Sequence, residues 1–318
     1  MIRNTNEKSN QKEENQMKKK KQKRQPFREA LKMELRQNKS TFIVYTILRI
    51  LVILVMIRQF FVGNYEGFFL CILTLILFLL PMVIQLQFKI ELPSTLEIII
   101  LLFAFSAEIL GEINAFYVII PFWDTILHTL NGFLAAAIGF SLVVLLNDSD
   151  RLAFELSPVF IAIVAFCFSM TIGVLWEFFE CGMDLIFHFD MQKDTVVHSI
   201  ASVMLDPAGR NHVVRMNGIQ DVMINGESLG LGGYLDIGLL DTMKDLFVNF
   251  IGAVVFSIIG FFYVKNKGKG EFAKSFIPKR KKAKNDFLQI QLDKAAQELQ
   301  AQQSVEKPTI RRKIQDGK

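Results

Sequence analysis

The sequence predicts an all-α polytopic membrane protein, a bundle of about six transmembrane helices with a small β-hairpin in an outer loop. Two observations lead to this fold class. The chain has 318 residues, of which 51% are hydrophobic, and its apolar residues gather in long runs in the middle. Its two ends are polar and basic. A run of roughly 20 apolar residues crosses the hydrocarbon core, and in lipid such a run must be helical to satisfy its own backbone.

The two ends carry most of the positive charge. Residues 1–40 and 265–318 hold 28 of the 36 Lys and Arg but only 11 of the 31 Asp and Glu. Lys and Arg are retained on the cytoplasmic side of membrane proteins. We therefore expect both ends to be cytoplasmic and the number of spans to be even, in a multi-pass protein of the cell membrane.

Residues 1–40 are rich in Lys, Gln, Asn and Glu, and they include the run KKKKQKR at 18–24. We expect a disordered cytoplasmic tail that becomes a surface helix from about residue 27 to residue 39. Residues 265–318 form a second basic cytoplasmic tail, expected to be partly helical. Basic runs next to a membrane favour contact with anionic lipid, and we expect no specific nucleic-acid partner.

The six expected spans form a membrane domain over residues 41–264. Ser157 followed by Pro158 is typical of a helix start, and it opens the fifth span. The small-residue run from Gly132 to Gly139 (GFLAAAIG), together with Gly252 and Gly260, favours close packing between helices. The expected ranges are 41–57, 67–86, 95–115, 125–146, 157–179 and 245–264.

The outer loop at 185–243 is the longest connection in the predicted membrane domain. It holds two Asn-Gly steps, Asn217-Gly218 and Asn225-Gly226, which are flanked by β-prone residues. Asn-Gly between such runs is a strong hairpin signal. We therefore expect a small β-hairpin or meander in this loop.

Polar residues recur where four of the spans approach the outer face. Ionisable residues in membrane spans are costly and are functional candidates by default. Their helical spacing groups them within each span, and the alternating direction of the spans brings the groups to one depth. The candidate polar site comprises Glu108, Glu112, Asp124, His128, Glu177, Glu180, Asp184, Asp241, Asp245 and Asn249.

Many carboxylates at one depth repel one another and need cations or protons in order to coexist. A divalent metal ion is one solution, and His128, Glu180 and Asp245 offer ligands that suit zinc or manganese. Shared protons, as in a proton relay, are another. Each acid taken singly could instead be a solvated interfacial group. Asp124 and Asp241 also lie at helix starts, where an acid is favoured in any case.

The motifs of several enzyme classes are missing from the sequence. It has no P-loop, no GxSxG, no HExxH and no dinucleotide-binding glycine pattern. Its three cysteines include no CxxC pair, so no disulfide framework is indicated. No catalytic residue is assigned, and whether the protein is an enzyme stays open.

Three segments together resemble the YjdF-like family of bacterial inner-membrane proteins: WDTILHTLNGFLAAAIGF at 123–140, WEFFECGMD at 176–184 and GYLDIGLLDTMKDLFVNFIGA at 233–253. The resemblance covers about residues 40–265 and implies a bacterial inner membrane. The last segment is also similar, more weakly, to VanZ-like proteins, which are associated with glycopeptide resistance. The matching positions are Asp124, His128, Glu177, Glu180, Asp241, Asp245, Asn249 and Gly252.

The resemblance implies no reaction, so the polar site itself leaves three functions open. The first is a membrane protein that binds a metal ion or a phosphate-bearing lipid headgroup at the outer face. The second is a proton- or cation-coupled transporter. The third is a non-catalytic envelope scaffold.

Overall fold

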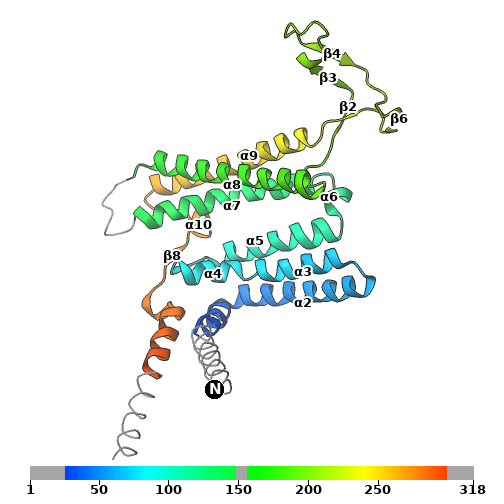
Figure 1. The fold of residues 1–318 in the computed structure, drawn as a ribbon. Coiled ribbons are helices and arrows are strands. Elements are labelled where there is room, and N and C mark those ends of the chain that lie inside the picture. The colour runs from blue at the N-terminus through cyan, green and yellow to red at the C-terminus, as the bar shows by residue number, and fades with distance from the viewer. Residues whose placement is uncertain (1–25, 148–155, 299–318) are drawn as a thin grey trace, which may run out of the picture. The chain divides into compact units, whose positions relative to one another are not determined.

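The computed structural model describes residues 26–147 and 156–298 (Figure 1). The expectations for the basic run at 18–24, for most of the inner loop at 147–155 and for the end of the chain from residue 299 lie outside the described residues. The chain forms two compact units. Tyr117–Gly270 is the second unit, and the described residues before and after it form the first.

The first unit is built from helices of the amino-terminal third. Residues 26–37 are helical, in agreement with the predicted surface helix. The core of the unit holds Tyr45, Val52, Cys71 and Phe78, all buried. The later elements are α2 (Lys39–Val62), α3 (Tyr65–Leu77), α4 (Leu80–Gln87), β1 (Ile90–Glu91), α5 (Ser94–Phe105) and the π-helix η1 (Ser106–Ile113).

The third predicted span differs from a regular α-helix. Helix α5 continues directly into η1, where Glu108 and Glu112 lie. A π-helix closes its hydrogen bonds five residues back, and the side chain of Asn114 ends it by donating Nδ2 to the carbonyl of Ile109 at 2.6 Å. π-Helical turns are often found at functional sites.

Part of the predicted carboxyl-terminal tail packs within the first unit. Strand β8 (Lys279–Arg280) pairs antiparallel with β1, and Phe276 and Ile277 are buried. The tail is therefore anchored within the first unit around residues 276–280. The other elements here are α10 (Glu271–Lys274), η3 (Ala283–Asn285) and a helix over residues 287–298.

The second unit is a bundle of three long helices (Figure 1). Residues near the starts of α7 and α9 meet the end of α8, so α7 and α9 run parallel and α8 runs antiparallel to both. The short α6 lies at the boundary with the first unit. The bounds are α6 (Phe116–Ile119), α7 (Trp123–Asn147), α8 (Pro158–Phe187) and α9 (Leu239–Lys265).

Glycines allow the three helices to approach one another closely. A Cβ added to Gly132 would lie 2.1 Å from the backbone oxygen of Asn249, and a Cβ added to Gly252 would lie 2.1 Å from that of Thr129. The two glycines thus let the backbones of α7 and α9 touch directly. Ser169 of α8 donates its hydroxyl to the carbonyl of Gly132 at 2.7 Å. The predicted packing role of these small residues is confirmed.

Short strand pairs form the connection from α8 to α9. The Asn225-Gly226 hairpin is confirmed, with positive φ at both residues and Ile224 paired with Glu227. Asn217 instead ends a strand that pairs with an earlier segment, so Asn217-Gly218 is a bend rather than a hairpin turn. The elements are β2 (Val196–Val197), β3 (Ser199–Ser202), η2 (Val203–Leu205), β4 (Val214–Asn217), β5 (Met223–Ile224), β6 (Glu227–Ser228) and β7 (Tyr234–Leu235). The pairs are β2 with β7, β3 with β4 and β5 with β6.

Five helical segments of the described residues are long and apolar enough to cross a membrane: α2, the joined α3–α4, α7, α8 and α9. The remaining predicted span, the third at 95–115, corresponds to α5 with η1, each of which is shorter than a membrane crossing. The mostly helical polytopic fold is confirmed. Helix α8 continues to Phe187 and α9 begins at Leu239, beyond the predicted limits, because hydropathy places the limits at charged residues that the helices in fact include.

Candidate functional site

The candidate site lies at one end of the α7–α8–α9 bundle. Asp124 lies in the first turn of α7, with His128 one turn later on the same face. Helix α8 contributes Glu177 and Glu180 from its last third, and α9 contributes Asp245 from its second turn. The antiparallel course of α8 brings its end to the starts of the other two helices, so the three helices place these side chains together.

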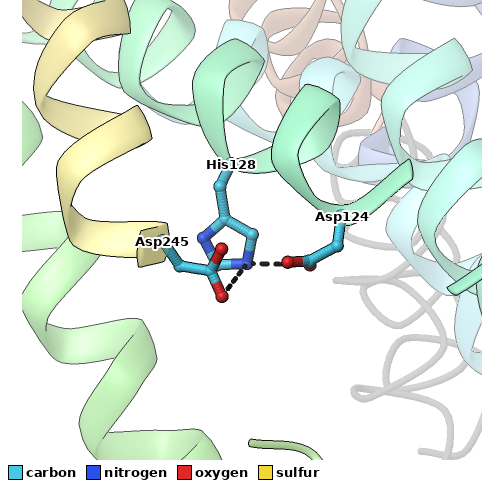
Figure 2. A group of neighbouring side chains, drawn as sticks. All are labelled: Asp124, His128 and Asp245. Atoms are coloured by element: carbon cyan, nitrogen blue, oxygen red, sulfur yellow. Dashed lines mark ion pairs between the residues drawn. The ribbon is translucent and has the colours of Figure 1, made fainter. Parts of the chain in front are cut away.

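His128 is the centre of the group, and both of its ring nitrogens face carboxylates. Nε2 lies 3.3 Å from Asp124 Oδ1 and 3.9 Å from Asp245 Oδ2, as Figure 2 shows. Nδ1 lies 3.8 Å from Glu177 Oε1 on the other side of the ring. One imidazole therefore joins the acids of all three helices.

Two overlapping sets of possible metal ligands share this histidine. One set is Asp124, His128 and Asp245, and the other is His128, Glu177 and Glu180; within each set the ligand atoms lie within 4.8 Å of one another. Trp176 donates its indole N–H to Glu180 Oε1 at 2.8 Å. Glu180 is thus fixed against its own helix.

Burial makes the negative charge of the site costly. The side chains of Asp245 and Glu177 are only 2% and 5% exposed. Asp245 Oδ1 and Glu177 Oε2 accept no hydrogen bond from the residues that the structure describes. A buried acceptor without a partner costs free energy, and a buried charge without a partner costs more.

Lys244 is the basic side chain at the rim of the site. Its Nζ lies 2.9 Å from Asp241, 3.4 Å from Asp124 and 3.6 Å from Asp245. With His128 protonated, Lys244 and His128 would bring two positive charges to the five carboxylates of Asp124, Glu177, Glu180, Asp241 and Asp245. With all five acids ionised the site would carry an excess of negative charge, which protons or a bound cation would have to offset.

Asn249 lies one turn deeper and forms an amide layer below the carboxylates. It is 1% exposed. Asn131 donates Nδ2 to its Oδ1 at 3.2 Å, and its own Nδ2 faces the sulfur of Met170 at 3.7 Å. A Cβ added to Gly173 would lie 2.7 Å from the same amide nitrogen. The amide thus fills the space between the three helices.

Two of the predicted site residues instead hold the connection between α8 and α9. Asp184 accepts the backbone N–H groups of Met191 and Gln192 at 2.7 and 2.8 Å. Asp241 accepts the backbone N–H of Lys193 at 2.9 Å. Both carboxylates satisfy loop backbone, so we assign them a structural part next to the site.

Asp236 is a third carboxylate that binds backbone N–H groups of the connection between α8 and α9. Asp184, Asp236 and Asp241 are together called the clamp. Its two oxygens accept the backbone N–H groups of Thr195 and Leu240, each at 2.7 Å. Partial burial acts to raise the pKa of Asp236, but the backbone N–H groups of Thr195, Leu240 and Gly238 outweigh it and hold the pKa below the ordinary value. The clamp is therefore strongest with the carboxylate ionised.

We expect Asp236→Asn to speed amide hydrogen exchange at Thr195 or Leu240 by roughly tenfold, because an amide offers one acceptor oxygen in place of two charged ones. The folded pKa is depressed, so in the wild type this protection is present above the ordinary Asp pKa and is lost as the pH falls through the folded value. Hydrogen exchange followed by mass spectrometry measures both effects. The exposed Asp221, which bonds within its own hairpin, gives the control Asp221→Asn. Unchanged exchange in Asp236→Asn would contradict the clamp.

Glu108 and Glu112 lie in η1 of the first unit, whereas the group around His128 belongs to the second unit. Glu108 is half-buried and Glu112 is exposed. They remain candidate functional residues only because an ionisable residue in a membrane span is costly.

Sequence reasoning missed three contributors. Lys244 lies three residues after Asp241, a spacing that predicts an ion pair on a helix. Trp176 lies four residues before Glu180, so helix periodicity could have predicted this contact as well. No local signal could have predicted that Asn131 meets Asn249, because only tertiary packing joins them.

The comparisons with known proteins identify a family. The family model described as predicted membrane protein (DUF2238) matches residues 42–266, which include both the helical bundle and η1. No curated protein and no solved structure matches the chain significantly. The matched region is consistent with the resemblance to the YjdF-like family. It spans more than half of the chain, and the chain therefore belongs to the DUF2238 family of predicted membrane proteins.

Proposed function

We propose that this membrane protein binds one divalent metal ion, zinc or manganese, through Asp124, His128 and Asp245. The observation that carries the proposal is the convergence of these ligand atoms within 4.8 Å around the buried Asp245, whose Oδ1 accepts no hydrogen bond from the described residues and has only an ion pair with Lys244. A divalent cation would offset the excess of negative charge. One histidine with carboxylates suits either metal.

The other nitrogen of His128 supports this choice of ligands. If Nε2 binds the metal, Nδ1–H faces Glu177 Oε1 at 3.8 Å. A carboxylate behind a metal-binding histidine fixes the orientation of the ring and raises its basicity. Asp124 has a 25% exposed side chain, which gives the ion a path from solvent, whereas Glu177 lies deeper.

Three protein ligands leave a coordination position open, as in sites that bind or activate a further molecule. We propose that a phosphate oxygen of a lipid headgroup takes this position. Lys244 supports the proposal, because its side chain is 45% exposed beside Asp124 and Asp245. A metal ion bound between Asp124 and Asp245 would take the place of the Lys244 ammonium group. That ammonium group would then be available to bind the phosphate.

Metal analysis of the purified protein tests the first step. We expect wild-type protein reloaded with zinc or manganese to hold about one ion per chain, the stoichiometry of a single three-ligand site. His128→Ala and Asp245→Asn should hold none. His212→Ala and Asp221→Asn change exposed residues of the α8–α9 connection and serve as matched controls that keep the ion.

Glu180→Gln separates the two ligand sets. Retained binding supports the set with Asp124 and Asp245, and lost binding would move the ion to the set with Glu177 and Glu180. Absence of metal from the reloaded wild type overturns the proposal and favours shared protons, as in a proton-coupled transporter. Phosphate binding, measured with labelled orthophosphate, should require the metal and weaken in Lys244→Met.

The basic ends of the chain suggest a place for the protein in the membrane. We propose that both ends face the cytoplasm of a bacterial cell and contact anionic lipid, as the distribution of Lys and Arg supports. The metal site then lies at the outer face. Cysteine labelling from outside intact cells, with a single cysteine placed at Asn225 in a cysteine-free background, tests the orientation.

A further inference from the structure

The first unit contains a second buried polar group, separate from the histidine site. A small cavity there is lined by Glu34, Asn38, Thr41, Tyr45 and Glu97, together with apolar residues. Glu34 belongs to the helix over residues 26–37, Thr41 to the first turn of α2 and Glu97 to the first turn of α5. Three helical segments thus bring oxygen atoms to one place.

Three buried oxygens at this cavity make no hydrogen bond of ordinary length to the described residues, although Thr41 and Asn38 lie beside Glu97. Glu34 Oε1, Thr41 Oγ1 and Glu97 Oε2 are buried and make no hydrogen bond with the residues that the structure describes. Glu34 and Glu97 are each 5% exposed. Buried polar atoms are normally satisfied, so three such atoms around one cavity indicate a bound species that bridges them.

The other oxygens of the two carboxylates are already in use. Lys281, from the carboxyl-terminal segment, forms a buried ion pair with Glu34 Oε2. Gln85 donates to Glu97 Oε1. Arg49 is exposed and bonds to the hydroxyl of Tyr45 at 3.2 Å. Lys281 therefore balances one of the two carboxylates, and the other, when ionised, leaves one negative charge at the cavity.

The size of the cavity limits what can neutralise this charge. The volume of the cavity is about 10 Å³, which is the room for a single water or small ion. Hydrated Mg²⁺ would bring several waters, and Ca²⁺ seeks six to eight oxygens. A bare monovalent ion fits both the space and the single charge.

We propose that this cavity binds one Na⁺ ion through Glu34 Oε1, Thr41 Oγ1 and Glu97 Oε2. The ion lies in the first unit, so the proposal is independent of the metal site in the bundle. Because Lys281 pairs with one of these carboxylates, sodium binding is also linked to the docking of the carboxyl-terminal segment.

Thermal unfolding of the full-length protein in detergent micelles tests the proposal, with a chelator present to silence divalent ions. Salt is supplied as NaCl, KCl or choline chloride at equal ionic strength. We expect sodium at ten times its Kd to raise the midpoint by roughly 3–6 °C over choline. No rise in NaCl overturns the proposal, and an equal rise in KCl overturns the assignment to sodium.

Two matched pairs of variants locate the effect. Glu97→Gln should lose the sodium response, whereas Glu66→Gln, at an exposed glutamate of the same unit, should keep it. Thr41→Val removes the hydroxyl at nearly constant shape and should weaken the response, whereas Thr41→Ser should retain it. If Glu97→Gln fails to fold, the comparison of Thr41→Val with Thr41→Ser still tests whether sodium binds at this cavity. A full response in Thr41→Val and Glu97→Gln would show that sodium acts elsewhere.

Discussion

Gly252→Ala is expected to destabilise the second unit by roughly 1–3 kcal/mol, the cost typical of an overpacked core. The new methyl group would lie 2.1 Å from the backbone oxygen of Thr129 and 2.8 Å from the backbone nitrogen of Phe133. Neither atom belongs to a flexible side chain, so α7 and α9 must move apart. The reciprocal change Gly132→Ala should have a similar effect, because it meets the backbone of Asn249.

Gly182→Ala gives the control with the opposite sign. Gly182 lies in α8, and a Cβ there meets nothing within 4 Å. Alanine is favoured over glycine in a helix by about 1 kcal/mol, so this variant should be neutral or more stable. Denaturant unfolding in micelles, followed by circular dichroism, compares the three variants. Equal stability of Gly252→Ala and wild type would contradict the close approach of α7 to α9.

Asp245→Asn is expected to change stability in opposite directions with and without divalent metal. In chelator, the neutral amide removes one of several neighbouring negative charges while keeping the shape of the side chain, so the variant should unfold at a higher temperature than the wild type. With metal at about 100 times Kd, the wild type gains about 2.7 kcal/mol from binding. The variant gains little, and the order of the two midpoints should reverse.

The reversal distinguishes a metal ligand from a merely buried acid. Thermal unfolding of both proteins, first in chelator and then in zinc or manganese, measures it. The control Asp221→Asn, at an exposed residue of the α8–α9 connection, should give the same order in both conditions. If Asp245→Asn stays more stable than the wild type in saturating metal, Asp245 is not a ligand.

Periodicity and topology account for much of the fold and for the grouping of the site. The spacing of Asp124 and His128 predicts one helix face, and alternating spans predict that Glu177 and Asp245 lie at the same end. The structure places these residues around one imidazole. These signals suffice because they depend on helix geometry and chain direction, which hydropathy shows.

Other features depend on information that periodicity lacks. Asp184 shares a helix face with Glu177, yet it bonds to the backbone of residues 191 and 192, because α8 ends soon after it and the chain folds back. The π-helical turn at Glu108 requires a change in hydrogen bonding that composition does not signal. The burial of Lys281 depends on a pairing of residues 90–91 with 279–280, which no local pattern indicates.

The shared contribution of three helices to the site has a consequence for biosynthesis. Chains are made from the amino terminus, so Asp124 and His128 enter the membrane first, Glu177 and Glu180 next and Asp245 last. Until α9 inserts, the acids of α8 lack a neighbour from that helix, and unpaired charge in lipid is costly. A nascent chain that stops before Leu239 would expose this charge. Insertion of α9 therefore completes the site as the last step in forming the three-helix bundle.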